Sequence, residues 1–208
     1  NIGYFNFCGD NYKLLDAYVR LGSEGRHVKL PYIELKDKKP KVTGIAIFHD
    51  DKMIIKLNLN EAKMMNFMRE KKAMGEFTLG DDYYKNICIY GKTKRKASCE
   101  KEGDKYIFTI DIDYAGEITN NSLYKDLEKD PKVIKKFEAD MVKKIEAECY
   151  EFINKMQKEY KEDLLGLGQI AAAKYGRHTG TSWDEVVSNS QIHVNVKVKV
   201  EKVGRGRF

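Results

Sequence analysis

An alternating strand pattern at residues 192–200 most constrains how this chain can fold. Isoleucine or valine occupies every even position, and polar or charged residues occupy the odd positions between them. Successive side chains of a strand point to opposite faces, so the pattern predicts a strand with one buried face and one wet face. The buried face needs an apolar layer against it, which favours a sheet covered by helices.

The longest helical pattern runs from about Lys132 to Glu162. Asp130 can cap this helix, and Pro131 suits its first turn. Apolar residues recur at steps of three and four and give the helix one apolar face: Ile134, Phe137, Met141, Ile145, Cys149, Phe152 and Met156. We expect this face to pack across the chain's own sheet, with a coiled-coil partner as the alternative.

Two pairs of strand patterns predict two hairpins. The first joins a strand over 42–48 to one over 53–59. The second joins 85–98 to 105–115 through a turn at Glu102-Gly103-Asp104, and its arms are long enough for the tip to project.

Two shorter helices complete the expected elements. The first is capped by Asn60, runs to about Lys72 and turns its apolar residues inward, namely Met64, Phe67 and Met68. The second covers Leu164–Tyr175 and contains Gly166 and Gly168. Because glycine costs about 1 kcal/mol in a helix interior, a close approach to a neighbouring element should compensate. The predicted fold class is α+β, a largely antiparallel mixed sheet of about four to five strands packed on a long C-terminal helix and shorter helices.

The chain is expected to contain parts of two domains. Residues 1–40 would be the end of a preceding domain and a linker, and residues 41–208 would form a C-terminal domain. The first part has four expected pieces: a strand at 4–7, a helix over 12–21, an extended run over 30–35 and a charged linker at 36–41. Since the sequence begins at Asn1, we expect it to be a piece of a longer protein.

The charge pattern disfavours a nucleic-acid partner. The 38 basic and 32 acidic residues are well mixed, and the net charge is only +6. The densest basic run, Lys92–Lys96, puts Lys92, Lys94 and Lys96 on one strand face. We expect a solvated strand end, with contact to anionic lipid headgroups as the alternative. No run of about 18 apolar residues suggests a membrane-spanning helix.

The four cysteines, Cys8, Cys88, Cys99 and Cys149, form no C-x-x-C pair and have no histidine at ligand spacing, so we expect no zinc site. Cys88 and Cys149 resemble small buried hydrophobes. A Cys88–Cys99 disulfide is possible but has no support in the sequence.

The remaining polar candidates also favour a structural interpretation. The histidines, His27, His49, His178 and His193, are scattered and are expected on the surface. Asp111 and Asp113 share one strand face, and we expect them to pair with opposing lysines rather than act in acid–base chemistry or bind a cation. We expect Asp50-Asp51 to be a turn rather than half of a calcium site, and Trp183 to fill the core rather than anchor an interface. No catalytic, cofactor-binding or metal residue is predicted, and the chain is not expected to be an enzyme.

The order of motifs after residue 42 resembles the Ger(x)C family, the C subunits of spore germinant receptors. The motifs are Gly44–Phe48 followed by Asp50–Met53, Gln157–Tyr160 with Asp163, the pair Gly166 and Gly168, Trp183-Asp184, and Val194–Val198 with Gly204. The family often carries prolines before the Trp-Asp element and before the last strand. Their absence here leaves the loop geometry between 175 and 192 open.

The resemblance implies a lipoprotein on the outer surface of the spore inner membrane, which works with an A and a B subunit. Its lipid anchor would lie outside this sequence, and Cys8 is not that site. The resemblance assigns no reaction or binding residue. The leading functional hypothesis is therefore a non-catalytic accessory or scaffold subunit acting through protein contacts in spore germination. The alternative is a module that binds a small molecule or a peptidoglycan fragment.

Overall fold

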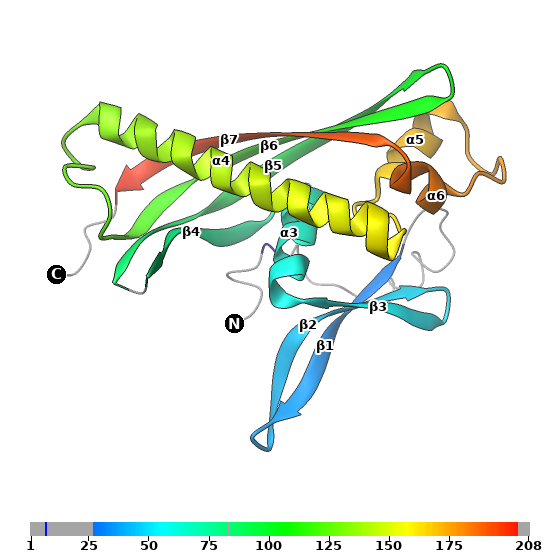
Figure 1. Cartoon of the computed structure of the whole chain (residues 1–208), viewed down its shortest axis with the longest axis horizontal. Coiled ribbons are helices and arrows are strands. Elements are labelled where there is room, and N and C mark those ends of the chain that lie inside the picture. Colours follow the sequence, from blue (N-terminus) through cyan, green and yellow to red (C-terminus); the bar gives the residue numbers. More distant parts are fainter. Residues whose placement is uncertain (1–6, 8–26, 83, 204–208) are drawn as a thin grey trace.

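The structure, a computed structural model, describes residue 7, residues 27–82 and residues 84–203 (Figure 1). Two sheets are arranged around a short helix and a long helix. The predicted helix over 12–21 lies outside the described residues. So does the predicted strand at 4–7, except for Phe7. The α+β class is confirmed, but the strands divide into a three-stranded and a four-stranded sheet rather than one sheet.

The three-stranded sheet has the order β1–β2–β3, with β1 at Val28–Lys36, β2 at Lys39–His49 and β3 at Lys52–Asn58. Both pairings are antiparallel. The predicted extended run and the first hairpin are therefore confirmed. The charged segment 36–41, predicted as a linker, instead forms the end of β1, the start of β2 and the turn between them, where Asp37 and Lys38 adopt positive φ. The assignment of residues 1–40 to a preceding domain stays a prediction.

Helix α3, Leu59–Arg69, lies between the two sheets and contacts β2, β3, β5 and α4. Its cap is Asn58, not the predicted Asn60. The Asn58 side chain accepts from the Glu61 backbone N–H at 3.0 Å, and the Glu61 carboxylate accepts from the Asn58 N–H at 2.8 Å. This reciprocal capping box starts the helix two residues earlier than expected. The predicted inward residues are buried: Met64, Phe67 and Met68.

The larger sheet has the order β4–β5–β6–β7. Its strands are β4 at Met74–Asp82, β5 at Lys85–Glu102, β6 at Lys105–Asn121 and β7 at Gln191–Val203. The hairpin of β5 and β6 is the predicted one, and its tip projects beyond the helices (Figure 1). Strand β4 was not predicted. Strand β7 pairs with β6 in parallel, so the chain crosses over one face of the sheet before it returns.

That crossover is made by α4, Pro131–Lys155, which packs along β7. Asp130 caps the helix and Pro131 begins it, as predicted. The predicted apolar face is largely buried, including Phe137, Met141, Ile145, Cys149 and Phe152. The helix ends earlier than expected, because residues 156–160 form a π-helical turn that stops at a left-handed Lys161. The long helix is also not the C-terminal element: two short helices and β7 follow it.

Side chains of α4 also satisfy the backbone of β7. The N–H groups of Val194, Val196 and Val200 donate to α4 side chains, namely Tyr150 Oη at 3.2 Å, Glu146 Oε1 at 3.1 Å and Glu138 Oε1 at 2.8 Å. Because β7 is the edge of the sheet, these N–H groups have no strand partner on that side. The helix therefore both covers the apolar face of β7 and closes its open edge.

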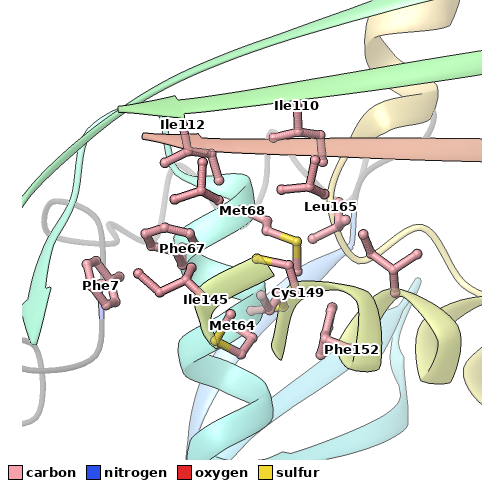
Figure 2. Close-up of a cluster of buried hydrophobic side chains, with 14 of the residues drawn as sticks. Phe7, Met64, Phe67, Met68, Ile110, Ile112, Ile145, Cys149, Phe152 and Leu165 are labelled. Carbon is pink, nitrogen blue, oxygen red and sulfur yellow. The ribbon is translucent and has the colours of Figure 1, made fainter. Parts of the chain in front are cut away.

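One apolar core joins the two sheets and their helices. Figure 2 shows side chains of α3, α4 and β6 packed together, with Phe67, Ile112 and Ile145 among them. Phe7 packs in the same core: its ring centroid lies 5.0 Å from that of Phe77 and 5.1 Å from that of Phe67. Residue 7 therefore contributes to the core built by the later elements.

The segment from 156 to 190 folds around α5, Leu167–Tyr175, and α6, Trp183–Ser188. The buried Asp163 carboxylate accepts from the N–H groups of Leu165, Leu167 and Gly168, which orients the start of α5. A Cβ on Gly168 would lie 2.5 Å from Trp183 Cβ, so the glycine permits the predicted close approach. Trp183 is 4% exposed and fills the core, as predicted.

The packing of β7 makes Val196→Asp a severe change. The Val196 side chain is 6% exposed and faces the core, so a buried carboxylate there should lower the free energy of unfolding by about 3 kcal/mol or more. Urea unfolding should show this loss. Lys199→Asp, on the wet face of the same strand, is the control and should stay within about 0.5 kcal/mol of the parent. A Val196→Asp variant that melts within about 2 °C of the parent would contradict the strand orientation.

The contact between Gly168 and Trp183 predicts that Gly168→Ala is destabilising by about 1–3 kcal/mol. In a free helix the same change would stabilise by about 1 kcal/mol, so the sign of the effect is informative. Gln169→Ala in the same turn is the control and should have little effect. Thermal unfolding of both variants tests the prediction, and a more stable Gly168→Ala variant would rule out the close approach.

Candidate functional site

Two histidines and two carboxylates from four separate segments meet in one cluster. We call it the His–carboxylate cluster: His27 just before β1, His49 at the end of β2, Glu162 in the loop after the π-helical turn, and Asp184 in the first turn of α6. One nitrogen or oxygen from each side chain lies within 4.8 Å of the others. It is the one group of at least three potential metal ligands found among the described residues.

His27 lies at the centre of the cluster. Its Nε2 is 2.9 Å from Asp184 Oδ1 and 3.3 Å from Glu162 Oε2. His49 Nδ1 is 3.5 Å from the same Glu162 oxygen, and the centroids of the two imidazole rings are 5.3 Å apart. His27 is 3% exposed, so the prediction of a surface histidine is wrong there, whereas His49 remains exposed on one side.

A second contact fixes one of the four side chains. Asp184 Oδ1 also accepts from the Asp163 backbone N–H at 2.7 Å, so its carboxylate is held from both sides. Glu162 Oε2 is buried, and two histidine nitrogens lie near it, His27 Nε2 at 3.3 Å and His49 Nδ1 at 3.5 Å. The cluster therefore contains a buried carboxylate oxygen that faces both imidazoles.

Burial and charge oppose each other in the cluster. Burial alone would lower the pKa of His27, but the hydrogen bond and charge of Asp184, with Glu162 and Asp163, raise it above its usual value. Burial and the neighbouring Asp184 raise the pKa of Glu162. Burial would raise the pKa of Asp184, but its bonds from His27 and from the Asp163 N–H leave it lowered. Such a group can hold a proton or a cation between its carboxylates.

No motif or spacing in the sequence points directly to this cluster. His27 and His49 come together only because β1 pairs with β2 along Val28 and Phe48. Asp184, however, belongs to the recognised Trp183-Asp184 motif, and Glu162 adjoins the motif residue Asp163. The motif residues and their neighbours were the available clue.

The other polar candidates lie apart from the cluster. Asp111 and Asp113 are exposed on β6 and pair in register with Lys96 and Lys94 of β5, as predicted. Asp113 also stands opposite Lys197, and Asp111 accepts from the Asn195 amide at 2.9 Å. The basic run therefore shares its face with carboxylates. The remaining exposed or turn residues follow the prediction: Asp50, Asp51, His178 and His193.

The cysteines show no pairing among the described residues. Cys88, Cys99 and Cys149 are free thiols, so the possible Cys88–Cys99 disulfide is not formed. Cys149 is buried as predicted, whereas Cys88 is only partly buried. Burial raises the pKa of the Cys149 thiol, which keeps it protonated.

An exposed apolar surface lies on the hairpin of β1 and β2, which projects from the body of the molecule (Figure 1). We call it the apolar strip: Pro31, Ile33, Leu35, Pro40 and Val42. Alternate residues of β1 share a face, and the register places Ile33 opposite Val42 and Leu35 opposite Pro40. Ile33 is 60% exposed and Leu35 is 79% exposed. Among the described helices, none is long and apolar enough to cross a membrane.

Comparisons with known proteins agree with this fold. The model of the family described as "Spore germination B3/ GerAC like, C-terminal" matches residues 43–204. The spore germination protein GerQC of Bacillus cereus is 26% identical over 188 residues, which cover 89% of this chain and 52% of GerQC. The chain thus spans about half the length of that relative.

The crystal structure of the GerBC protein shares the fold. It matches with a TM-score of 0.72 at 20% identity, over 94% of this chain and 65% of GerBC. The structural match shows the α+β architecture, and the family model covers most of the chain. The chain belongs to the spore germination B3/GerAC-like family, which confirms its resemblance to the Ger(x)C C subunits.

Proposed function

We propose that this chain is part of a non-catalytic accessory subunit of a nutrient germinant receptor, which acts through protein contacts during spore germination. Membership of the spore germination family and the likeness to GerQC support the process. The observation that supports the mode of action is the apolar strip. A projecting hairpin with strongly exposed Ile33 and Leu35 is typical of a surface that another protein covers.

The partners that we propose are the A and B subunits of the receptor. The subunit would be held at the outer surface of the spore inner membrane by a lipid anchor outside the present sequence. The strip occupies one face of the hairpin. Glu34 and Tyr32 lie on the other face, where Lys56 forms an ion pair with Glu34 and lies 4.0 Å from the centroid of the Tyr32 ring. A contiguous exposed apolar patch is typical of a surface that a partner covers.

Leu35→Glu should impair nutrient germination without unfolding the protein. Leu35 is so exposed that the change should alter the free energy of unfolding by no more than about 0.5 kcal/mol. A charge at the centre of an apolar contact should nevertheless weaken binding at least tenfold. Spores carrying the variant should germinate severalfold more slowly with nutrients while dormancy stays intact. Tyr84→Glu, at a residue 81% exposed and distant in sequence from the strip, is the control.

Site-specific photocrosslinking in intact spores should identify the contact. A crosslinker at Ile33 should capture another receptor subunit, and one at Lys197, on the wet face of β7, should capture much less. Equal capture from both positions, or normal nutrient germination of the Leu35→Glu spores, would contradict the proposed docking surface.

A further inference from the structure

The His–carboxylate cluster has the composition of a transition-metal site. Two imidazole nitrogens and two carboxylate oxygens form a ligand set that zinc accepts, normally with four ligands in a tetrahedron. Hard cations such as Mg²⁺ and Ca²⁺ prefer oxygen ligands alone. The two histidines therefore favour zinc over these cations.

We propose that His27, His49, Glu162 and Asp184 bind one zinc ion, which fastens the three-stranded sheet to the C-terminal helices.

The distances between the four ligand atoms suit a zinc ion if the side chains move slightly closer together. Ligands of a tetrahedral zinc ion lie at about 2.0–2.2 Å from the metal, hence about 3.4 Å from each other. The four atoms already lie within 4.8 Å of one another. His27 Nε2 is 3.3 Å from Glu162 Oε2, and His49 Nδ1 is 3.5 Å from it, close to the required separation. His49, with 49% of its side chain exposed, has room to adjust.

The charges suit a divalent cation as well. With both imidazoles neutral, the two carboxylates carry two negative charges in a half-buried place. In the ion pairs of the described residues, Glu162 and Asp184 pair only with these two histidines. A Zn²⁺ ion would balance both carboxylates and would be bound by the buried Glu162 oxygen that faces both imidazoles.

The origin of the ligands indicates a structural role. His27 directly precedes β1 and His49 ends β2 of the three-stranded sheet, whereas Glu162 lies in the loop before α5 and Asp184 lies in α6. A metal bound to all four would hold together parts of the chain that are more than a hundred residues apart. Such a crosslink stabilises the folded state because the unfolded chain has no preformed site.

The competing interpretation is an ion-pair network without metal, in which protonated His27 bridges Asp184 and Glu162. Zinc titration separates the two. The 208-residue chain is first stripped with a chelator, and ZnCl₂ is then added while heat release and melting temperature are followed. We expect one ion per chain. At free Zn²⁺ roughly a hundredfold above Kd, the melting temperature should rise by about 5 °C or more. MgCl₂ should produce neither effect.

His49→Gln is the decisive variant because His49 is half exposed and the chain should fold without it. It should weaken zinc binding at least tenfold and remove the rise in melting temperature. His193→Gln, an exposed histidine on the wet face of β7, is the matched control and should bind zinc like the parent. Absence of binding by the parent, or equal affinity in the His49→Gln variant, would overturn the proposal.

A second variant guards against a folding defect in the first. Glu162→Gln keeps the size of the side chain but removes the anionic oxygen, and it should also lose the zinc-dependent rise. Circular dichroism without metal should match the parent for both variants. Visible absorption of the Co²⁺-loaded parent should show nitrogen and oxygen ligands without thiolate bands. Thiolate bands that persist in both variants would place the metal at a cysteine and reject the cluster.

Discussion

The packing of α4 across β7 is the interaction on which the rest of the structure depends. Each buried side chain in this layer contributes roughly 1.5–3 kcal/mol, and the valines of β7 meet the apolar face of α4 along its length. The same helix supplies acceptors to three N–H groups of β7. A buried N–H without a partner costs about 1–3 kcal/mol, so a purely apolar helix could not replace α4 here.

Much of this layer is visible in the sequence because it rests on local periodicity. The alternation over 192–200 and the spacing of Phe137, Met141 and Ile145 gave the buried faces of β7 and α4 correctly. The long hairpin was likewise predicted from its alternation and the turn at Gly103. Local patterns could not give the pairing of distant strands. The parallel contact of β7 with β6, the division into two sheets and the existence of β4 depend on the crossover and on α3.

The His–carboxylate cluster escaped sequence reasoning for the same reason. No spacing rule connects His27 to Asp184, and the two meet only after β1, β2 and α6 are in place. The prediction of scattered surface histidines assumed that distance along the chain means distance in space. The prediction of the residue that caps α3 was wrong for a more local reason. Asn58 and Asn60 are both suitable capping residues, but only Asn58 has a glutamate, Glu61, three residues later.

Residues of the motifs that identify the family form hydrogen bonds that connect separate elements of the fold. Gln157 donates to the carbonyls of Val187 and Ser190, which holds the end of α6. Tyr160 donates to Glu61 at 3.0 Å and so ties the π-helical turn to α3. With Asp163, these residues join the end of the long helix to three other elements. The family motifs therefore include the residues that connect the end of α4 to α3, α5 and α6. The same connections place Glu162 and Asp184 in the His–carboxylate cluster.

The position of β7 in the chain has a consequence for synthesis. Strand β6 leaves the ribosome about seventy residues before β7, so its future partner edge stays open while α4 and the short helices are made. During that interval the outer edge of β6, which is already paired with β5 on its other side, is available to any other extended peptide. The growing chain reaches its protected state only when residues 191–203 are released, and this interval is where a slow ribosome or a missing chaperone would cause aggregation.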